Sequence, residues 1–205
     1  MTIFAVLGIL WAFFLGSIPT GYILGKIKGA DIRNSGSGNI GATNAFRTFG
    51  KLIGLLVLIF DIFKGWFSVA IIYKIAFAPF IADYDPNLIK ALLGVVVIAG
   101  HIWTPFLNFK GGKGVATAFG VMIATDFSLT AIGFGAFIIT LIATRYVSAG
   151  SLIAVLAIWA LSISFAFPRA VILLTIFIFI VIWLRHLSNI KRILKGTERK
   201  IKKII

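Results

Sequence analysis

Seven long apolar runs, separated by short polar segments, make up most of this chain. A helix needs roughly 20 apolar residues to cross a hydrocarbon core about 30 Å thick. Only the second run contains charged side chains, Asp61 and Lys64. The pattern predicts an all-α, polytopic integral membrane protein whose seven transmembrane helices lie within residues 3–25, 52–73, 91–109, 114–125, 127–144, 146–168 and 170–184.

The basic residues favour seven crossings over six. If residues 114–144 cross twice, 16 Lys and Arg lie on one side of the membrane and three on the other. If they cross once, the two sides hold 8 and 11 Lys and Arg, and the bias is lost. Basic residues gather on the cytoplasmic side, so we expect the N-terminus outside and the C-terminus in the cytoplasm. The run 114–125 spans only about 18 Å as a helix, and we expect it to begin at depth beside a watery cleft.

Composition excludes a soluble globule, because 60% of the residues are hydrophobic and only 13% are charged. The net charge of +14 would suggest nucleic acid in a soluble protein. Here the membrane topology explains it, and we expect no nucleic-acid partner. Residues 185–205 are expected to form a basic cytoplasmic tail that holds anionic lipid. The absence of Cys excludes thiol catalysis and disulfides.

A polar, glycine-rich segment, residues 34–44, follows the first apolar run. Its G-x-G-x-x-G spacing is not a dinucleotide-binding loop, because no strand precedes it. Glycines nevertheless let backbone N–H groups turn toward an anion, and hydroxyl and amide side chains add donors. The alternative is a flexible loop. The candidate residues are Ser37 as a catalytic group and Gly36, Gly38, Asn39, Gly41, Thr43 and Asn44 as substrate ligands.

A second polar segment, residues 109–117, precedes the short fourth run. It lacks the spacing of a phosphate-binding Walker loop, but a helix start with two lysines makes an anion site. The alternative is a pair of topogenic lysines beside a helix-breaking glycine pair. Lys113 is the catalytic candidate here, and Lys110, Gly111, Gly112 and Gly114 are candidate ligands.

Both histidines lie on the predicted cytoplasmic side. His101 is close in sequence to the lysine segment, and His186 shares a helix face with Asn189 and Arg192 if that helix continues. A lone membrane histidine is often a packing residue, but two beside Lys or Arg favour a catalytic role. No third ligand with suitable spacing supports a metal site. Within the second run, Asp61 and Lys64 are predicted to pair.

Four stretches resemble the bacterial membrane acyl-phosphate:glycerol-3-phosphate acyltransferase family. They are Gly16-Ser-Ile-Pro-Thr-Gly-Tyr22, residues 36–44 with Arg47, Gly100-His101 with residues 109–117, and residues 186–192 with Gly196-Thr197-Glu198. The resemblance covers essentially the whole chain and adds Arg47 to the candidate ligands. One departure is visible: the family usually has an aromatic-Pro pair where this chain reads Trp103-Thr104, with Pro105 one place later.

The resemblance implies a single transmembrane acyltransferase domain over residues 1–205, in the bacterial inner membrane, with its active site facing the cytoplasm. An acyl phosphate would donate its acyl group to the sn-1 hydroxyl of glycerol 3-phosphate, giving lysophosphatidate and phosphate. This is the first acylation of phospholipid synthesis. We expect no cofactor and a monomer in the lipid bilayer.

Two phosphorylated substrates need two anion sites, and the sequence offers two basic or glycine-rich loops on one side. Because the donor is already activated, direct attack is favoured, with a substrate phosphate oxygen accepting the hydroxyl proton. A general base at His101 or His186 is the alternative. A transporter for an anionic solute is the alternative from another class, but we find no convincing inverted repeat.

Overall fold

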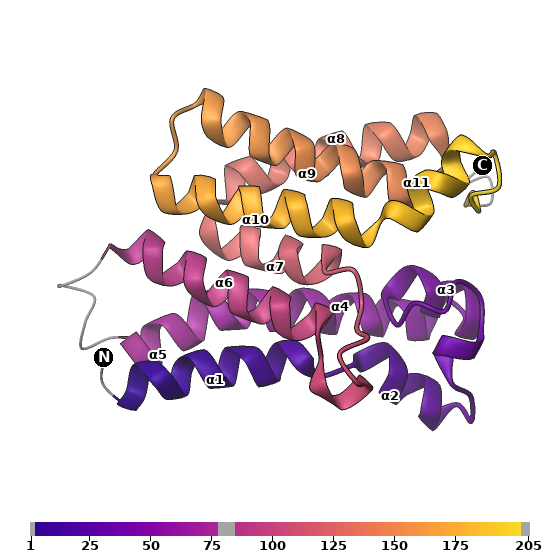
Figure 1. The fold of residues 1–205 in the computed structure, drawn as a ribbon, viewed down its shortest axis with the longest axis horizontal. Helices are drawn as coiled ribbons and strands as arrows, with labels where there is room; N and C mark the ends of the chain where they lie inside the picture. Colours follow the sequence, from indigo (N-terminus) through magenta and orange to yellow (C-terminus); the bar gives the residue numbers. More distant parts are fainter. Residues whose placement is uncertain (1–2, 78–84, 202–205) are drawn as a thin grey trace. The chain divides into compact units, whose positions relative to one another are not determined.

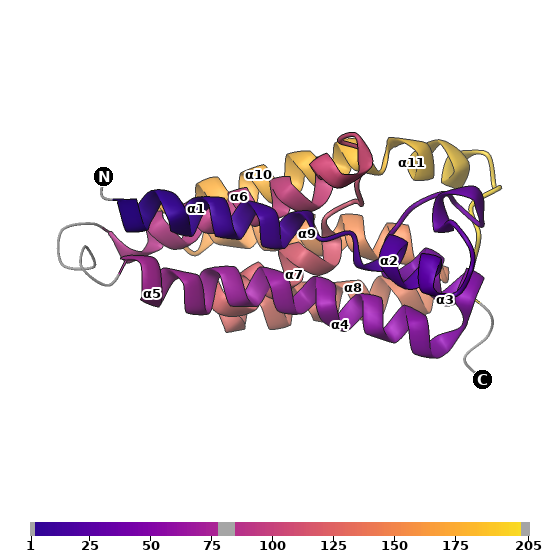
Figure 2. The same cartoon turned by 90° about the horizontal axis from the view of Figure 1, so that it is seen from below.

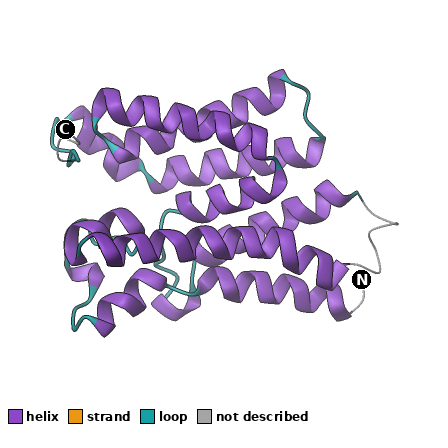
Figure 3. Ribbon diagram, turned by 180° about the vertical axis from the view of Figure 1, so that it is seen from behind, coloured by secondary structure: helices purple, strands orange, loops and turns teal. Residues whose placement is uncertain are grey.

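The computed structural model describes residues 3–77 and 85–201, and every regular element in these ranges is a helix (Figure 3). The chain forms two compact units, Met1–Thr125 and Asp126–Ile205. The first contains α1 (Ile3–Ser17), α2 (Thr20–Ile27), η1 (Ile32–Asn34), α3 (Ala42–Phe49), α4 (Lys51–Phe67), η2 (Ser68–Ile72), α5 (Tyr73–Phe77), α6 (Pro86–Ile102), η4 (Pro105–Leu107) and α7 (Val115–Thr125). The second contains α8 (Phe127–Thr144), α9 (Val147–Ser164), α10 (Arg169–Arg185) and α11 (Leu187–Leu194).

The first apolar run is not one helix, as the sequence predicted, but two. α1 ends at Ser17, and α2 begins at Thr20 after a bend of 44°. The cause is Pro19, which has no N–H to donate and disfavours a helical residue before it. The break leaves carbonyl oxygens at the end of α1 that need donors from elsewhere in the protein.

Close helix packing in the first unit depends on glycine. α1 packs on α6, and α4 packs on α7. At each contact a glycine faces a backbone carbonyl of the partner helix, and an added methyl group would collide with that carbonyl. Small residues permit this approach between membrane helices. The contacts are Gly16 on Val97, Gly100 on Phe13, Gly65 on Thr117 and Gly120 on Ile62.

The polar connections of the first unit gather at the end of the bundle away from the N-terminus. Figures 1 and 2 show α2, α3 and the connection from α6 to α7 at this end. One buried apolar cluster joins them: Ile32 from η1, Ile40 from the glycine-rich loop, Leu107 from η4, and residues of α3 and α4. The glycine-rich loop and the turn that precedes the lysine segment therefore share one core.

Each of the seven apolar runs is found in one or two helices, which confirms the all-α class. In the described residues, four helices are long and apolar enough to cross a membrane: Lys51–Phe77, Pro86–Leu107, Phe127–Thr144 and Val147–Ser164. The number is six if each bent pair, α1–α2 and α10–α11, is counted as one span. α7 has only 11 residues, so seven crossings and the orientation of the termini stay predictions. The pattern also missed α3 and α11, which are short and amphipathic.

Replacing Gly65 by alanine should loosen the contact between α4 and α7, because the methyl group would meet the carbonyl of Thr117. Overpacking of this kind costs about 1–3 kcal/mol. We expect a lower melting temperature of the detergent-solubilised protein. Gly135→Ala on α8 is the control, since an added methyl there meets nothing within 4 Å. Equal melting temperatures for the two variants would contradict the packing argument.

Candidate active site

The buried amide of Asn44 holds the glycine-rich loop in shape. Its Nδ2 donates to the carbonyls of Ile32 at 3.2 Å, Ser35 at 3.0 Å and Asn39 at 2.8 Å. Its Oδ1 accepts the N–H of Ser37 at 2.8 Å. These bonds occupy both ends of the amide. Asn44 therefore orders the loop from within, a role that the sequence alone did not distinguish from substrate binding.

Ser37 lies between two left-handed glycines, Gly36 (φ +63°) and Gly38 (φ +70°). Ser37 is exposed to solvent. The sequence suggested that neighbouring N–H groups would point at an anion together with the hydroxyl. Instead, the N–H of Ser37 binds Asn44, and that of Gly38 donates to Ser35 O at 3.0 Å. The N–H of Gly41 likewise donates to Oδ1 of Asn39 at 2.9 Å. These three N–H groups maintain the loop, and the exposed Ser37 adds a hydroxyl group to it.

Residues 109–114, which we call the lysine loop, are docked onto the end of α6. The N–H of Gly111 donates to Ile102 O at 3.0 Å, and that of Gly112 donates to His101 O at 3.1 Å. Both glycines are buried. These two N–H groups fix the loop to α6, and the place of Gly111 and Gly112 among the substrate ligands stays a prediction. The lysine loop ends at Gly114, whose φ of +86° turns the chain into α7.

The two lysines of this loop differ in environment. Lys110 is exposed, whereas Lys113 is half-buried and stands directly before the start of α7. The first N–H groups of a helix have no intrahelical acceptor and carry a partial positive charge. A cation at this point and the helix start together favour an anion. Lys113 is thus better placed than Lys110 to hold a phosphate close.

The predicted pairing of Asp61 with Lys64 is confirmed. Lys64 Nζ lies 2.8 Å from Asp61 Oδ1, and both side chains are almost fully buried. The same Nζ lies 2.8 Å from Nδ1 of His101 and donates to the carbonyl of Ile18 at 3.2 Å. His101 therefore belongs to a buried polar network of the first unit.

The departure from the family pattern at Trp103-Thr104 has a structural role. Thr104 is fully buried, and its hydroxyl donates to the carbonyl of Ser17 at 2.7 Å, at the break after α1. Its Oγ1 also accepts the N–H of Phe106 and so caps η4. Proline at position 104 would supply no such donor. The chain leaves α6 through this capped turn.

In the second unit, the carboxylate of Glu198 accepts hydrogen bonds from three side chains. Its Oε1 accepts from Asn189 Nδ2 at 2.6 Å and from the hydroxyl of Ser148 at 2.8 Å, and its Oε2 accepts from Arg192 Nε at 2.7 Å. Burial alone would raise the pKa of this carboxyl group. The three hydrogen bonds and the charge of Arg192 outweigh burial, and the pKa falls below its usual value.

The expected face shared by His186, Asn189 and Arg192 required a helix that continues straight past His186, and the helix does not do so. α10 ends at Arg185, and α11 follows after a bend of 57°. Asn189 and Arg192 do share a face, since both contact Glu198. The ring of His186 is buried, with Nδ1 2.8 Å from the carbonyl of Ile182. Glu198 contacts Ser148 and the candidate ligands Asn189 and Arg192, and the sequence analysis selected neither Ser148 nor Glu198, although Glu198 lay in a family-like stretch.

In the first unit, Asp31 lies just before the glycine-rich loop in the sequence. The side chain of Arg33 binds it, with Nη2 2.7 Å from Oδ2, and lowers its pKa to about 2. Asp31 and Glu198 thus both already bind arginine. Within residues 3–77 and 85–201, no three His, Asp or Glu side chains gather as metal ligands.

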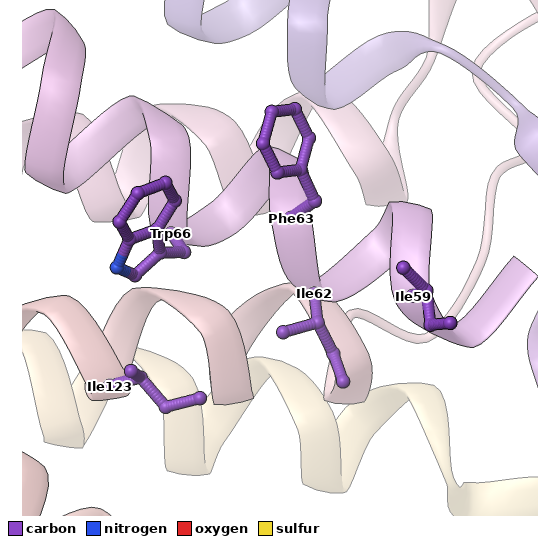
Figure 4. Close-up of a pocket in the computed structure, with 5 residues that line it drawn as sticks. All are labelled: Ile59, Ile62, Phe63, Trp66 and Ile123. Carbon is purple, nitrogen blue, oxygen red and sulfur yellow. The ribbon is translucent and has the colours of Figure 1, made fainter.

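An apolar pocket of about 290 Å³ lies on the α4–α7 pair. Figure 4 shows Ile59, Ile62, Phe63 and Trp66 on α4, with Ile123 on α7. Its lining suits a hydrocarbon chain. Ile123 is eight residues beyond the start of α7, so the pocket is about 12 Å along the helix from the lysine loop.

A family model described as glycerol-3-phosphate acyltransferase matches residues 6–196. The chain belongs to the glycerol-3-phosphate acyltransferase family. A family member from Trichlorobacter lovleyi, named glycerol-3-phosphate acyltransferase, is 44% identical over 201 residues, covering 95% of this chain and 98% of the relative. Another from Bacillus anthracis, named glycerol-3-phosphate acyltransferase 2, is 41% identical over 197 residues, covering 96% and 98%.

Two crystal structures of PlsY (YgiH), an integral membrane glycerol 3-phosphate acyltransferase, share the family fold. The glycerol 3-phosphate form has a TM-score of 0.87 and 37% identity, over 97% of this chain and 96% of that one. The lysophosphatidic acid form has a TM-score of 0.84 and 35% identity, over 97% and 95%. Together with the apolar helices, this likeness makes the chain an integral membrane protein.

Docking of the C-terminal segment, which Glu198 anchors to Ser148, Asn189 and Arg192, should depend on pH. Because the folded-state pKa of Glu198 is lowered, its stabilisation is present above the unfolded pKa and is lost as pH falls through the folded value. We expect amide hydrogen exchange of residues 196–201 to quicken at acid pH.

Glu198→Gln should show fast exchange already at neutral pH and no acid step. Asp31→Asn is the control, because Asp31 also has a lowered pKa but binds Arg33 in the first unit. An acid step that persists in Glu198→Gln would contradict the assignment.

Proposed function

We propose that this protein transfers an acyl group from acyl phosphate to the sn-1 hydroxyl of glycerol 3-phosphate, giving lysophosphatidate and inorganic phosphate. As a member of the family, it is a glycerol-3-phosphate acyltransferase. The choice of acyl phosphate as donor is the part that goes further. The observation that best supports it is a pair of loops suited to anions, both in the first unit, with an apolar pocket on α4 and α7 of the same unit.

Both proposed substrates carry phosphate, and the donor also carries a hydrocarbon tail. The glycine-rich loop and the lysine loop offer a place for each phosphate. The pocket on α4 and α7 offers apolar surface for the tail. Holding the acceptor hydroxyl near the acyl carbon replaces a bimolecular encounter by a positioned one, which gives a large rate enhancement.

We propose that turnover depends on Ser37, Lys113, His101 and His186. Lys113 and the start of α7 would stabilise negative charge on the departing phosphate, and Ser37 would donate to a phosphate or to the carbonyl oxygen. The proposed substrate-binding set in the first unit is Gly36, Gly38, Asn39, Gly41, Thr43, Asn44, Arg47, Lys110, Gly111, Gly112 and Gly114, several of them acting through loop shape. In the second unit it is Asn189 and Arg192.

Direct attack fits these groups better than a covalent acyl-enzyme. In the attack, the sn-1 oxygen of glycerol 3-phosphate bonds to the acyl carbon as the bond between that carbon and the departing phosphate oxygen breaks. A phosphate oxygen of a substrate takes the hydroxyl proton. The carboxylates of Asp31 and Glu198 already bind arginine side chains, so neither matches the orienting acid of a Ser-His-Asp set. A general base at His186 or His101 is the alternative, and separate pH–rate profiles of the two variants distinguish them.

We further propose seven crossings in the bacterial inner membrane, with the active site facing the cytoplasm and the protein monomeric. The charge distribution of the loops supports this orientation. The C-terminal segment would add electrostatic attraction to anionic lipid. The transporter alternative loses its main support, since the buried charges Asp61 and Lys64 form an ion pair.

Removing either proposed phosphate donor should lower turnover while the bundle stays folded. Losing one preorganised donor typically costs about 10²–10³ in turnover. We expect that loss for Lys113→Ala and for Ser37→Ala, measured as lysophosphatidate formed per minute by purified protein. Lys110→Ala is the matched control and should lose less, because Lys110 is exposed. Near wild-type turnover in both test variants, with unchanged melting temperatures, would reject their roles.

The donor is tested by phosphate release. Purified protein in detergent should release phosphate from a synthetic acyl phosphate only when glycerol 3-phosphate is present. Palmitoyl-CoA and acyl carrier protein should be poor donors, as the resemblance to the acyl-phosphate-dependent family implies. Comparable turnover with palmitoyl-CoA would overturn the choice of donor but not the family.

A further inference from the structure

The ammonium of Lys64 is deeply buried within the first unit, outside the proposed phosphate contacts. Three acceptors surround it: Asp61 Oδ1 at 2.8 Å, His101 Nδ1 at 2.8 Å and the carbonyl of Ile18 at 3.2 Å. The hydroxyl of Thr20 lies 3.5 Å from the same carboxylate oxygen. An ammonium has three donors and no acceptor, so one lysine here satisfies groups from the α1–α2 break, α4 and α6.

This arrangement fixes the protonation of the histidine ring. Because Lys64 can only donate, Nδ1 of His101 is the acceptor and carries no proton. The ring is then neutral, with its proton on Nε2. Nδ1 faces the ion pair, and Asp61 Oδ1 lies 3.7 Å from it. The ring orientation is therefore set from the side opposite to Nε2.

The Nε2 side of the ring supports the lysine loop. Gly112 is so close that a methyl group added to it would collide with Nε2, Cε1 and Cδ2 of His101. The neighbouring Gly111 is close in a different way, because a methyl group there would meet the backbone carbonyls of His101 and Ile102. The same carbonyls accept the N–H groups of the two glycines. One side chain and two carbonyls thus determine where the loop lies.

We propose that Asp61, Lys64 and His101 form a positioning network that holds the lysine loop in its phosphate-binding shape. In this proposal His101 is a positioning residue, acting through Gly112, and not the general base. The imidazole ring of His101 connects the ion pair of α4 to the loop before α7. The proposal deepens the proposed function and rests on it, because the loop is taken to hold a substrate phosphate.

The first test exploits the difference between the two glycines. His101→Ala and Gly112→Ala should each raise the KM of the substrate whose phosphate the loop holds, with losses of up to about 100-fold in kcat/KM. In the double variant the two losses should not multiply, because His101→Ala removes the ring atoms with which the new methyl group at position 112 would collide. His101→Ala combined with Gly111→Ala is the matched control. Its effects should multiply, since the carbonyls that face Gly111 remain.

The second test separates positioning from folding. Lys64→Met leaves the carboxylate of Asp61 buried without its ammonium, and we expect a low yield of folded protein. Asp61→Asn/Lys64→Met removes both charges and should recover that yield. KM should nevertheless stay raised, because Nδ1 of His101 has lost its ammonium donor. A wild-type KM in this double variant would show that the ion pair serves folding alone.

Two further results would overturn the proposal. One is multiplicative loss in both glycine combinations. The other is a His101→Ala variant with unchanged KM, lowered kcat and one ionisation missing from its pH–rate profile, which is the signature of a general base. Hydrogen exchange of residues 109–114 is measured in the same variants, and should quicken in His101→Ala whether or not acyl transfer is detected. Absent wild-type turnover would reject the proposed function, whereas unchanged exchange would reject the network.

Discussion

A buried ammonium needs acceptors, and the way Lys64 obtains them organises the end of the first unit. An unpaired charge in a membrane interior is expensive, and Asp61 supplies the partner charge 2.8 Å from the ammonium of Lys64. Its remaining donors reach the carbonyl of Ile18, freed by the break at Pro19, and the ring of His101. Removing the proline break, the carboxylate or the ring would leave at least one group of this set unsatisfied.

The glycines of both loops do a different task from the one that their sequence suggests. Glycine-rich loops commonly turn N–H groups toward a phosphate. Here the N–H groups of Ser37, Gly38, Gly111 and Gly112 hold the loops to Asn44, to Ser35 and to the end of α6. In the proposed function, phosphate binding then falls to side chains and to the start of α7. Such a frame is rigid, and rigid donors stabilise developing charge without reorganisation.

The sequence revealed the helical class, the polar loops and the pairing of Asp61 with Lys64, because each has a local signal: length, composition or spacing. It missed the break at Pro19 within an uncharged run, since an apolar pattern does not register the lost N–H. It also missed the roles of Asn44 and Glu198. Asn44 contacts neighbours up to 12 residues away, and Glu198 meets Ser148 across 50 residues. Such partners are set by packing, which no periodicity encodes.

The protonation of the His101 ring tests the account most directly. Nitrogen-15 NMR of protein labelled in its two histidines distinguishes the neutral tautomers from the charged ring, and a His186→Gln variant assigns the signals. The account predicts that His101 is neutral at pH 7, with Nδ1 accepting a hydrogen bond and the proton on Nε2. It also predicts that this signal changes in Asp61→Asn/Lys64→Met. A protonated Nδ1 in the wild-type protein would contradict the network.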